Sequence, residues 1–532
     1  MSEWFYLNNM SFSRIYSAQT NLLRGKIVTI EVDITEKTLH SFTVVGLPDK
    51  AVEESKDRMS SALKNSDYRS PKNQNQKIVI SLSPADLKKE GPYFDLAIAL
   101  AYLLSGEEIN FNPDGRIFLG ELSLNGDLRA IKGALPLAEE AKRLGFQEIF
   151  LPVDNAKEAA LVEGIKIYGA KNLKEVIDHI YIPKKDRSGK LLEPERPKIK
   201  PAPKTEIIHS QKTGGLDFSD IKGQEAAKRG LEIAASGGHN IAMSGPPGTG
   251  KTMLARVFSR ILPDLSHDDC LEITGIHSVV GILEENIITE PPFRSPHHTA
   301  SYVSMIGGGQ NIKPGEVTLA HRGVLFLDEF PEFEKRVLEA LRQPLEDNFV
   351  SVSRAKGSAV FPSNFILIAA MNPCPCGNRG NKQKQCICKP SDLDRYKRRI
   401  SGPIMDRIDM WVTVGNVDFE KLSNGEREGE TTKEIKERVL KARDIQIKRF
   451  KSAQRKINTN SEMNVKELNI YAPLDEETKK ILNQSAERLQ LSARAYHRTI
   501  KLARTIADLA GSEKILTPHI LEALQYRPKE IY

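Results

Sequence analysis

The chain has 532 residues, of which 39% are hydrophobic and 28% charged, a composition typical of soluble globular protein with room for roughly three domains. No segment reaches the roughly 18 apolar residues of a membrane span, and residues 1–5 lack the basic start of a secretory signal, so we expect a cytoplasmic protein with no membrane partner. The net charge of +7 permits a nucleic-acid partner without requiring one.

The N-terminal part, residues 1–182, is predicted to be a mixed α/β domain. Residues 25–33, 41–45 and 77–81 alternate or cluster β-branched residues as strands do. Residues 93–104 and 134–143 have the pattern of helices.

A change of composition ends this domain. Residues 183–204 contain five prolines and eight Lys or Arg against three Asp or Glu, without apolar periodicity. We interpret residues 183–215 as a stiff, solvated linker to the next domain.

A glycine-rich segment after the linker fits the phosphate-binding pattern G-x-x-x-x-G-K-[ST], with a strand (239–244) predicted before it and a helix (251–262) after it. Its residues are Gly245, Pro246, Pro247, Gly248, Thr249, Gly250, Lys251 and Thr252. The glycines let backbone N–H groups surround the phosphates of ATP at the start of a helix. Lys251 is expected to hold the β- and γ-phosphates, and Thr252 to bind Mg²⁺.

A second motif supplies the acidic groups that an ATP site needs. Residues 323–329, GVLFLDE, have the pattern of a buried strand that ends in Asp328 and Glu329. Asp328 is expected to share Mg²⁺ with Thr252, and Glu329 to polarise the attacking water. A chance glycine-rich turn would account for the first motif alone, but the two motifs together predict an ATPase domain over residues 216–424.

Four of the five cysteines lie close together, as the pairs Cys374 with Cys376 and Cys386 with Cys388. Disulfides are rare in cytoplasmic proteins, so two close pairs favour a structural zinc site inside the ATPase domain. The C-x-C spacing is tighter than the usual C-x-x-C, and a redox-labile pair or an iron–sulfur site stays open as an alternative. The histidine pair at 297–298 lacks such partners, and we interpret it as making polar loop contacts.

Residues 425–532 follow a polar break and are predicted to be helical. Together with the two ATP motifs, the segments AMNPC at 370–374, SGPIMDRID at 401–409 and SARAYHR at 492–498 form an ordered set. This set resembles the YifB/ComM-type magnesium-chelatase-like AAA+ ATPases, and the resemblance covers nearly the whole chain. It implies an α/β fold with a Lon-protease-like N-terminal domain, an AAA+ core and a C-terminal helical lid.

The resemblance also implies roles for two residues at the ATP site. Asn372, after a predicted strand at 365–371, matches the sensor 1 residue that orients the lytic water. A turn asparagine is the alternative. Arg494 matches the sensor 2 arginine of the lid, with a solvated helix face as the alternative.

Arg407 is similar to the arginine finger of the family, which reaches the ATP of a neighbouring subunit and therefore implies a homohexamer. A salt bridge with Asp406 or Asp409 is one alternative. Another is that Arg398 or Arg399 serves as the finger.

DNA is expected to contact a hairpin. Residues 349–361 form two β-type runs around a short basic turn, and family members carry such a hairpin pointing into the pore of the ring. Arg354 and Lys356 would then bind DNA phosphates, although a solvated hairpin tip is the alternative. The glycine-rich segment 305–311 is a second candidate pore loop.

Residues 88–95, 120–126 and 133–135 are similar in layout to the proteolytic domain of Lon proteases. There, a lysine amine activates a serine hydroxyl. The matching positions here hold Tyr93 and Leu135, which cannot form that dyad. We therefore expect no peptidase activity and interpret the domain as a scaffold or an accessory binding tier.

The resemblance implies an ATP-dependent DNA translocase or helicase, with ATP, Mg²⁺ and structural Zn²⁺ as cofactors. It would act as a homohexamer on single-stranded and branched DNA, promoting branch migration in homologous recombination of incoming DNA during natural transformation. The alternative is a magnesium-chelatase-like motor that remodels a protein partner, although the usual motor subunit lacks this N-terminal domain and the cysteine cluster. A third hypothesis is an ATP-dependent protein-binding scaffold related to proteases.

Overall fold

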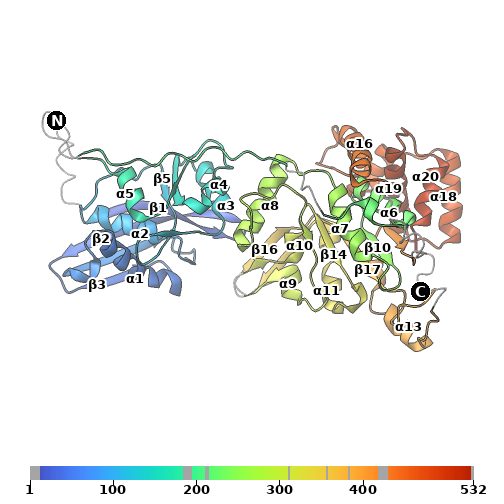
Figure 1. Ribbon diagram of the computed structural model, residues 1–532, viewed down its shortest axis with the longest axis horizontal. Coiled ribbons are helices and arrows are strands. Elements are labelled where there is room, and N and C mark those ends of the chain that lie inside the picture. The colour runs from blue at the N-terminus through green and yellow to red at the C-terminus, as the bar shows by residue number, and fades with distance from the viewer. Residues whose placement is uncertain are drawn as a thin grey trace. The chain divides into compact units, whose positions relative to one another are not determined.

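The computed structural model describes residues 12–183, 194–209, 215–309, 312–354, 357–380, 384–416 and 429–528 (Figure 1). The chain forms two compact units. Met1–Ile208 and Cys270–Ile288 make the first, and His209–Asp269 and Thr289–Tyr532 make the second. Within the described ranges, no helix has the length and apolar character that crossing a membrane requires.

The first unit is organised around a seven-stranded sheet, counted over its described residues, in the order β3-β4-β2-β1-β5-β8-β9. Along β2, Val28, Ile30, Val32 and Ile34 are buried and alternate with more exposed residues, so one face of the sheet lies in the core. The elements are β1 (Phe12–Asn21), β2 (Arg24–Glu36), β3 (Ser41–Val45), α1 (Lys50–Asn65), β4 (Gln76–Ser83), α2 (Asp95–Ser105), β5 (Arg116–Phe118), β6 (Glu121–Leu122), β7 (Leu128–Arg129), α3 (Ala134–Arg143), β8 (Glu148–Pro152), α4 (Val153–Ala159), β9 (Lys166–Ala170) and α5 (Leu173–Ile180).

The three strands and two helices predicted in this part of the sequence are confirmed as β2, β3, β4, α2 and α3. The observed β2 is longer than predicted and continues to Glu36. The long strand β1, which pairs antiparallel with β2, was not predicted.

The segment interpreted as a solvated linker belongs to the first unit over residues 194–208. The N–H of Ala202 donates to the carbonyl oxygen of Ile167 at 2.7 Å, and the N–H of Thr205 donates to that of Ala160 at 3.2 Å. Proline lacks an N–H group that needs a partner, so a proline-rich chain can lie along a surface with few hydrogen bonds. The segment therefore lies along the unit through a few contacts, while most of its described residues are exposed, as expected of a solvated segment.

A further part of the first unit comes from inside the predicted ATPase sequence. The helix α8 (His267–Val280) brings Ser278 to this unit, where its hydroxyl donates to the carboxylate of Glu158 and accepts the N–H of Gly133 at 2.9 Å. Burial raises the pKa of Glu158. The predicted boundaries did not anticipate this insertion, because the residues that hold it lie more than a hundred positions away in sequence.

The second unit contains a five-stranded sheet, counted over its described residues, in the order β11-β14-β17-β10-β18, with every neighbouring pair parallel. Parallel strands require crossover connections, which helices provide. The elements up to the sheet's last strand are α6 (Glu225–Gly237), β10 (Ile241–Ser244), α7 (Lys251–Ile261), β11 (Phe293–Arg294), α9 (Tyr302–Ile306), β12 (Gly307–Gly308), β13 (Lys313–Pro314), α10 (Glu316–Leu319), β14 (Val324–Leu327), α11 (Lys335–Ala340), α12 (Pro344–Asp347), β15 (Phe349–Arg354), β16 (Gly357–Pro362), β17 (Ile366–Met371), α13 (Pro390–Lys397), α14 (Gly402–Met405) and β18 (Met410–Thr413).

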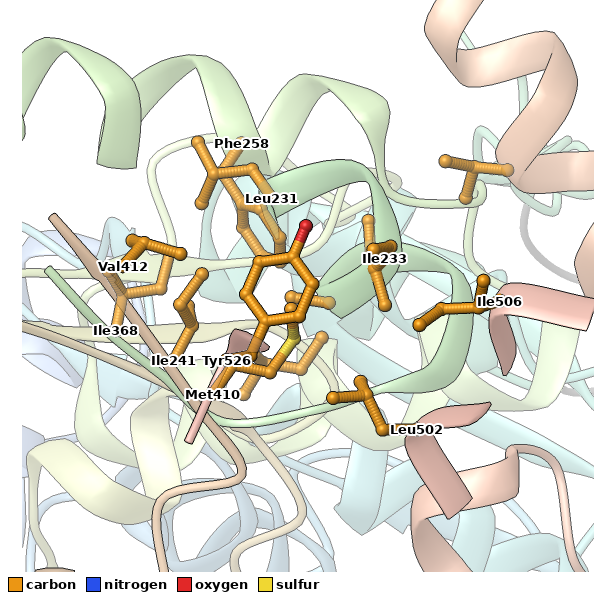
Figure 2. Packing of buried hydrophobic residues seen from close by; sticks show 14 of the residues in the cluster. Leu231, Ile233, Ile241, Phe258, Ile368, Met410, Val412, Leu502, Ile506 and Tyr526 are labelled. Atoms are coloured by element: carbon orange, nitrogen blue, oxygen red, sulfur yellow. The ribbon is translucent and has the colours of Figure 1, made fainter. Parts of the chain in front are cut away.

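One hydrophobic core joins this sheet to the C-terminal helices. In Figure 2, Tyr526 lies beside Met410 of β18, with Leu502 and Ile506 on the side of the C-terminal helices. The sheet and the C-terminal helices therefore share buried surface within one unit. These helices are α16 (Thr432–Phe450), α17 (Val465–Tyr471), α18 (Glu476–Arg488), α19 (Ala493–Leu509) and α20 (Thr517–Gln525).

The elements predicted around the ATP motifs are present. The strand before the phosphate loop is β10, the helix after it is α7, and the strand before Asn372 is β17. The predicted hairpin is also confirmed, since β15 and β16 pair antiparallel from Phe349 with Pro362 to Arg354 with Gly357.

Candidate ATP site and metal centre

The parallel sheet brings the predicted ATP motifs to one edge. β17 lies between β10, which leads into the phosphate loop, and β14, which leads to Asp328 and Glu329. The carboxyl ends of parallel strands lie at the same edge of a sheet. Asn372, directly after β17, is therefore placed between the loop and the acidic pair.

The phosphate loop has a backbone that only glycines permit at two positions. Gly250 precedes α7 with a φ of 88°, in the left-handed region. At Gly245 a Cβ would lie 2.1 Å from the carbonyl oxygen of Val414, so a side chain there would clash. Among the described residues, no atom comes within 4 Å of a Cβ built at Gly250. The loop thus surrounds an open space at the start of a helix, where backbone N–H groups bind anions.

Lys251 points back into this loop. Its Nζ donates to the carbonyl oxygens of Gly245 at 2.7 Å and Pro246 at 2.8 Å, and lies 3.4 Å from Oδ1 of Asn372. Burial lowers the pKa of Lys251, and the charge of Asp328 opposes this effect. In this structure, the ammonium group of Lys251 is therefore satisfied by carbonyl oxygens of the loop itself.

The two expected Mg²⁺ ligands, Thr252 and Asp328, are in direct contact. Oγ1 of Thr252 donates to Oδ2 of Asp328 at 2.9 Å. Neighbouring ligands in an octahedral shell at about 2.0–2.1 Å from Mg²⁺ lie about 2.9 Å apart. The pair therefore fits the ion, with phosphate and water oxygens to complete its shell.

Glu329 has an unusual backbone and a histidine partner. Its φ is 51°, in the left-handed region that residues other than glycine rarely adopt. Its Oε2 lies 3.0 Å from Nδ1 of His298. His298 follows β11, whose carboxyl end lies at the same edge of the sheet as that of β14. His298 therefore contacts one oxygen of the carboxylate that is expected to polarise the attacking water.

Arg407 and Arg494 converge on one carboxylate, that of Glu346 in α12, and each bonds to one of its two oxygens. Arg407 also donates to the carbonyl oxygen of Pro403 at 2.6 Å. Only 7% of the Arg407 side chain is exposed, against 45% for Arg494. Burial is the largest single influence and raises the pKa of Glu346, but the hydrogen bond from Arg407 and the charges of the nearby arginines together hold this pKa below its usual value.

The described part of the structure does not contain the salt bridge with Asp406 or Asp409 that was considered as an alternative for Arg407. Among the described residues, its ion pair is with Glu346 and not with Asp406 or Asp409. Asp409 instead accepts a hydrogen bond from Arg498 at 2.7 Å. Arg407 therefore pairs with Glu346, 61 positions away in the sequence, in place of a neighbouring aspartate.

The four clustered cysteines are brought together around one point, with all Sγ atoms within 4.8 Å of one another. Three Sγ pairs are separated by 3.4, 3.7 and 3.6 Å. Four thiolates at about 2.3 Å from a tetrahedral Zn²⁺ lie about 3.8 Å apart. A cluster of several irons would hold its ligands farther apart, so the donor set fits a single ion. The residues are Cys374, Cys376, Cys386 and Cys388.

Backbone N–H groups point at these sulfurs. The N–H of Arg379 donates to Sγ of Cys374 at 3.3 Å, and that of Cys376 to Sγ of Cys388 at 3.4 Å. Burial raises the pKa of Cys374 and raises that of Cys388 to about 12, whereas the N–H of Asn378 is the main cause that lowers the pKa of Cys376 to about 6. Such groups stabilise thiolates, the form in which cysteine binds metal.

We expect the purified protein to carry about one Zn²⁺ per chain and a Cys386→Ser, Cys388→Ser variant to carry almost none, because two ligands of four remain. The variant should also melt at a lower temperature, since its loop loses the metal crosslink. Elemental analysis and thermal melting test this, with Cys270→Ala as the matched control that keeps its zinc. Iron in place of zinc, or equal zinc in both proteins, would contradict the assignment.

The cysteine segment touches the ATP site. A Cβ at Gly377 would lie 2.6 Å from the ring of Pro247 in the phosphate loop. Tyr396 of α13 donates through its hydroxyl to the carbonyl oxygen of Asn372 at 3.0 Å. The metal-binding segment is therefore packed against the residues that would surround the γ-phosphate.

The two segments expected to face a pore are the tip of the β15–β16 hairpin and residues 305–311. The backbone of Arg354 ends β15, whereas Lys356 lies outside the described residues. In the glycine-rich segment 305–311, Met305 and Ile306 are buried in α9 and Gly307–Gly308 forms β12. Residues 305–308 are therefore part of a helix and a strand and do not form a free loop.

In the first unit, Tyr93 and Leu135 are both largely buried. The hydroxyl of Tyr93 lies 3.4 Å from that of Thr20, and burial raises the pKa of Tyr93. Leu135 has no exposed surface, and its N–H donates to the carboxylate of Glu158 at 2.8 Å. These side chains provide no pair of nucleophile and base.

Comparisons with known proteins agree with this geometry. Models of the magnesium chelatase subunit ChlI match residues 217–422 and 30–155, and a model of its C-terminal part matches 429–527. Competence protein ComM of Haemophilus influenzae is 39% identical over 523 residues, which cover 97% of this chain and 98% of that protein. The uncharacterized protein YifB of Escherichia coli is 41% identical over 521 residues, or 97% of each chain.

The chain belongs to the ComM/YifB family of magnesium-chelatase-like proteins. This confirms the resemblance read from the sequence and the α/β fold with an AAA+-like module. DNA repair protein RadA of Streptococcus pneumoniae is 31% identical over 99 residues, which cover 19% of this chain and 23% of that protein. The model match over 217–422 contains both ATP motifs and the cysteine cluster.

Three contacts at the site of this ComM/YifB chain were not predicted from the sequence. His298 was interpreted only as a polar loop residue, although its position after a strand parallel to β14 places it near Glu329. The roles of Glu346 and Tyr396 could not be predicted, because their contacts join residues far apart in the sequence and leave no periodic pattern.

Proposed function

We propose that this chain is an ATP-driven DNA translocase of the helicase class that works as a homohexamer and promotes branch migration during recombination of incoming DNA. The observation that carries the proposal is the convergence of Lys251, Thr252, Asp328 and Asn372 at one sheet edge. A relative that matches 97% of the chain is named as a competence protein, which supports DNA as the substrate.

ATP would bind with its phosphates in the loop before α7. Lys251 exchanges its carbonyl partners for the β- and γ-phosphates, and Thr252 and Asp328 hold Mg²⁺, which neutralises phosphate charge. Glu329 leaves His298 and accepts a proton from the attacking water, while the amide of Asn372 orients that water.

Charge that develops on the γ-phosphate would be stabilised by arginines. Arg494 acts from the C-terminal helices, and Arg407 of a neighbouring subunit acts as the finger. Both are held by Glu346 in the single chain, so each must exchange this carboxylate for phosphate oxygens. The zinc site is structural and fixes the segment that follows Asn372.

A second candidate is a chelatase-type motor that remodels a protein partner. The match to magnesium chelatase models over 217–422 favours it. The β15–β16 hairpin and the match to ComM over almost the full length favour DNA. DNA-stimulated ATP turnover distinguishes the two.

We expect ATP turnover to rise with single-stranded or four-way-junction DNA, and an Arg354→Ala, Lys356→Ala variant to lose that rise because two phosphate contacts are removed. Steady-state ATPase assays at two salt concentrations measure this. A Lys433→Ala, Lys441→Ala variant, with the same change of charge on exposed positions of α16, should respond to DNA as the wild type does. A turnover rate indifferent to every DNA would favour the protein-remodelling motor.

A further inference from the structure

The chain between the metal cluster and the end of α13 carries a group of exposed cations. Figure 1 shows α13 projecting from the body of the second unit. Over the described residues of 379–399, the acidic side chains are Asp392 and Asp394. The exposed cations are Arg379, Lys384, Lys389, Arg395, Arg398 and Arg399.

Most of these cations are unpaired. Arg399 forms an ion pair with Glu332, whereas the other five form none with residues that the structure describes. Like charges held close together repel, and a bound polyanion relieves that repulsion. We call the five unpaired cations, together with Arg399, the basic knuckle surface.

A hollow borders three of these cations, Arg395, Arg398 and Arg399. Its volume is about 340 Å³, enough for roughly ten water molecules at about 30 Å³ each, and therefore for a phosphodiester group with its ordered water. Four of its lining residues are cations and one is an acid. The lining consists of Lys335, Arg395, Arg398, Arg399, Glu332, Pro331 and Phe333.

The basic knuckle surface is connected to the ATP site. Tyr396, next to Arg395 in α13, holds the carbonyl oxygen of Asn372, and Gly377 packs on Pro247 of the phosphate loop. An anion that moves α13 would therefore act directly on the residues expected around the γ-phosphate.

We propose that the basic knuckle surface binds the phosphodiester backbone of nucleic acid, as a contact separate from the β15–β16 hairpin. This inference rests on the proposed DNA-motor function. Four of the six cations are arginines, whose planar guanidinium groups match phosphate oxygens in pairs. Ile387 lies between Cys386 and Cys388 in the sequence and is 83% exposed, so its side chain offers an apolar contact for a base.

The test is direct DNA binding by the nucleotide-free full-length protein over a series of salt concentrations. An Arg395→Gln, Arg398→Gln variant should make the negative slope of log K against log salt less steep by about 1.5 to 2, because two phosphate contacts are lost. At about 0.1 M salt its affinity should fall about 10- to 50-fold. Fluorescence anisotropy with labelled single-stranded and duplex oligonucleotides measures both.

Two further variants keep the test decisive. Lys384→Gln with Lys389→Gln changes the two exposed lysines of the basic knuckle surface and should also make the slope less steep. Lys433→Gln with Lys441→Gln on α16 changes the charge equally and should leave it unchanged. Equal zinc content and melting temperature show that each protein is folded.

The measurements distinguish failure of the proposed function from failure of this inference alone. A wild type that binds no DNA at any salt concentration would remove the proposed function and this inference together. DNA binding with an unchanged slope in both surface variants would overturn only the inference. Loss of DNA-free ATP turnover with an unchanged slope would also overturn the inference, and would assign these cations to the nucleotide of a neighbouring subunit. Equally tight binding of polyglutamate would overturn it as well, and would indicate an acidic protein as the partner.

Discussion

Glu329→Gln is expected to lower ATP turnover by about 10²–10⁴-fold while ATP binding is retained. The amide cannot accept a proton from water, whereas Lys251 and Thr252, which are expected to hold the phosphates and Mg²⁺, are unchanged. Single-turnover hydrolysis and titration with a fluorescent ATP analogue measure the two effects separately.

Glu334→Gln is the matched control. Glu334 is exposed at the start of α11 and its side chain makes no capping hydrogen bond there, so turnover should stay close to that of the wild type. Hydrolysis at the wild-type rate by the Glu329→Gln protein would show that another group activates the water. His298 would then be examined first, because its imidazole lies 3.0 Å from the same carboxylate.

Arg407→Ala is expected to lower turnover by about 10³–10⁵-fold, the range measured for arginine fingers, and to be rescued by mixing with Glu329→Gln protein. In a mixed ring, some interfaces place an intact Glu329 opposite an intact Arg407, although neither pure protein has such an interface. Steady-state ATPase activity at a series of mixing ratios detects the rescue.

The mixing experiment also tests a purely structural role. Arg407 is bonded to Glu346 of its own chain, and if that contact alone mattered, mixed proteins would be as inactive as the pure variants. Arg488→Ala, an exposed arginine on α18, should be active alone and give no rescue of Glu329→Gln. Activity that rises with mixing therefore separates an arginine acting between subunits from one that holds its own chain.

The parts of the ATP site that could be predicted are those with a local signature. The phosphate loop needs glycine at Gly245 and Gly250 for reasons of backbone shape and close packing, and this need is visible in the sequence. The acidic pair follows an apolar strand, and Asn372 follows another. Because the strands are parallel, their ends meet, and the meeting of these motifs was predictable once the strands were recognised.

The contacts that could not be predicted join loops and helices far apart in the sequence. Glu346 bonds to Arg407 and Arg494, which are 61 and 148 positions away. Nothing in the residues around Glu346 distinguishes it from a solvated glutamate at the surface of a short helix. The few contacts of residues 194–208 with the first unit were missed for a related reason, because a proline-rich, charged composition is the same for a solvated linker and for one that lies along a domain.

The inclusion of Cys270–Ile288 in the first unit has a consequence for the order of folding during synthesis. Domains usually fold from the N-terminus as the chain leaves the ribosome. Here Ser278 supplies one of the hydrogen bonds to the buried Glu158, and Leu271 and Ile287 cover apolar residues of the same unit. The first unit is therefore complete only when the phosphate loop has already been made, so the ATPase segment that follows the linker must begin to emerge before the N-terminal unit can close.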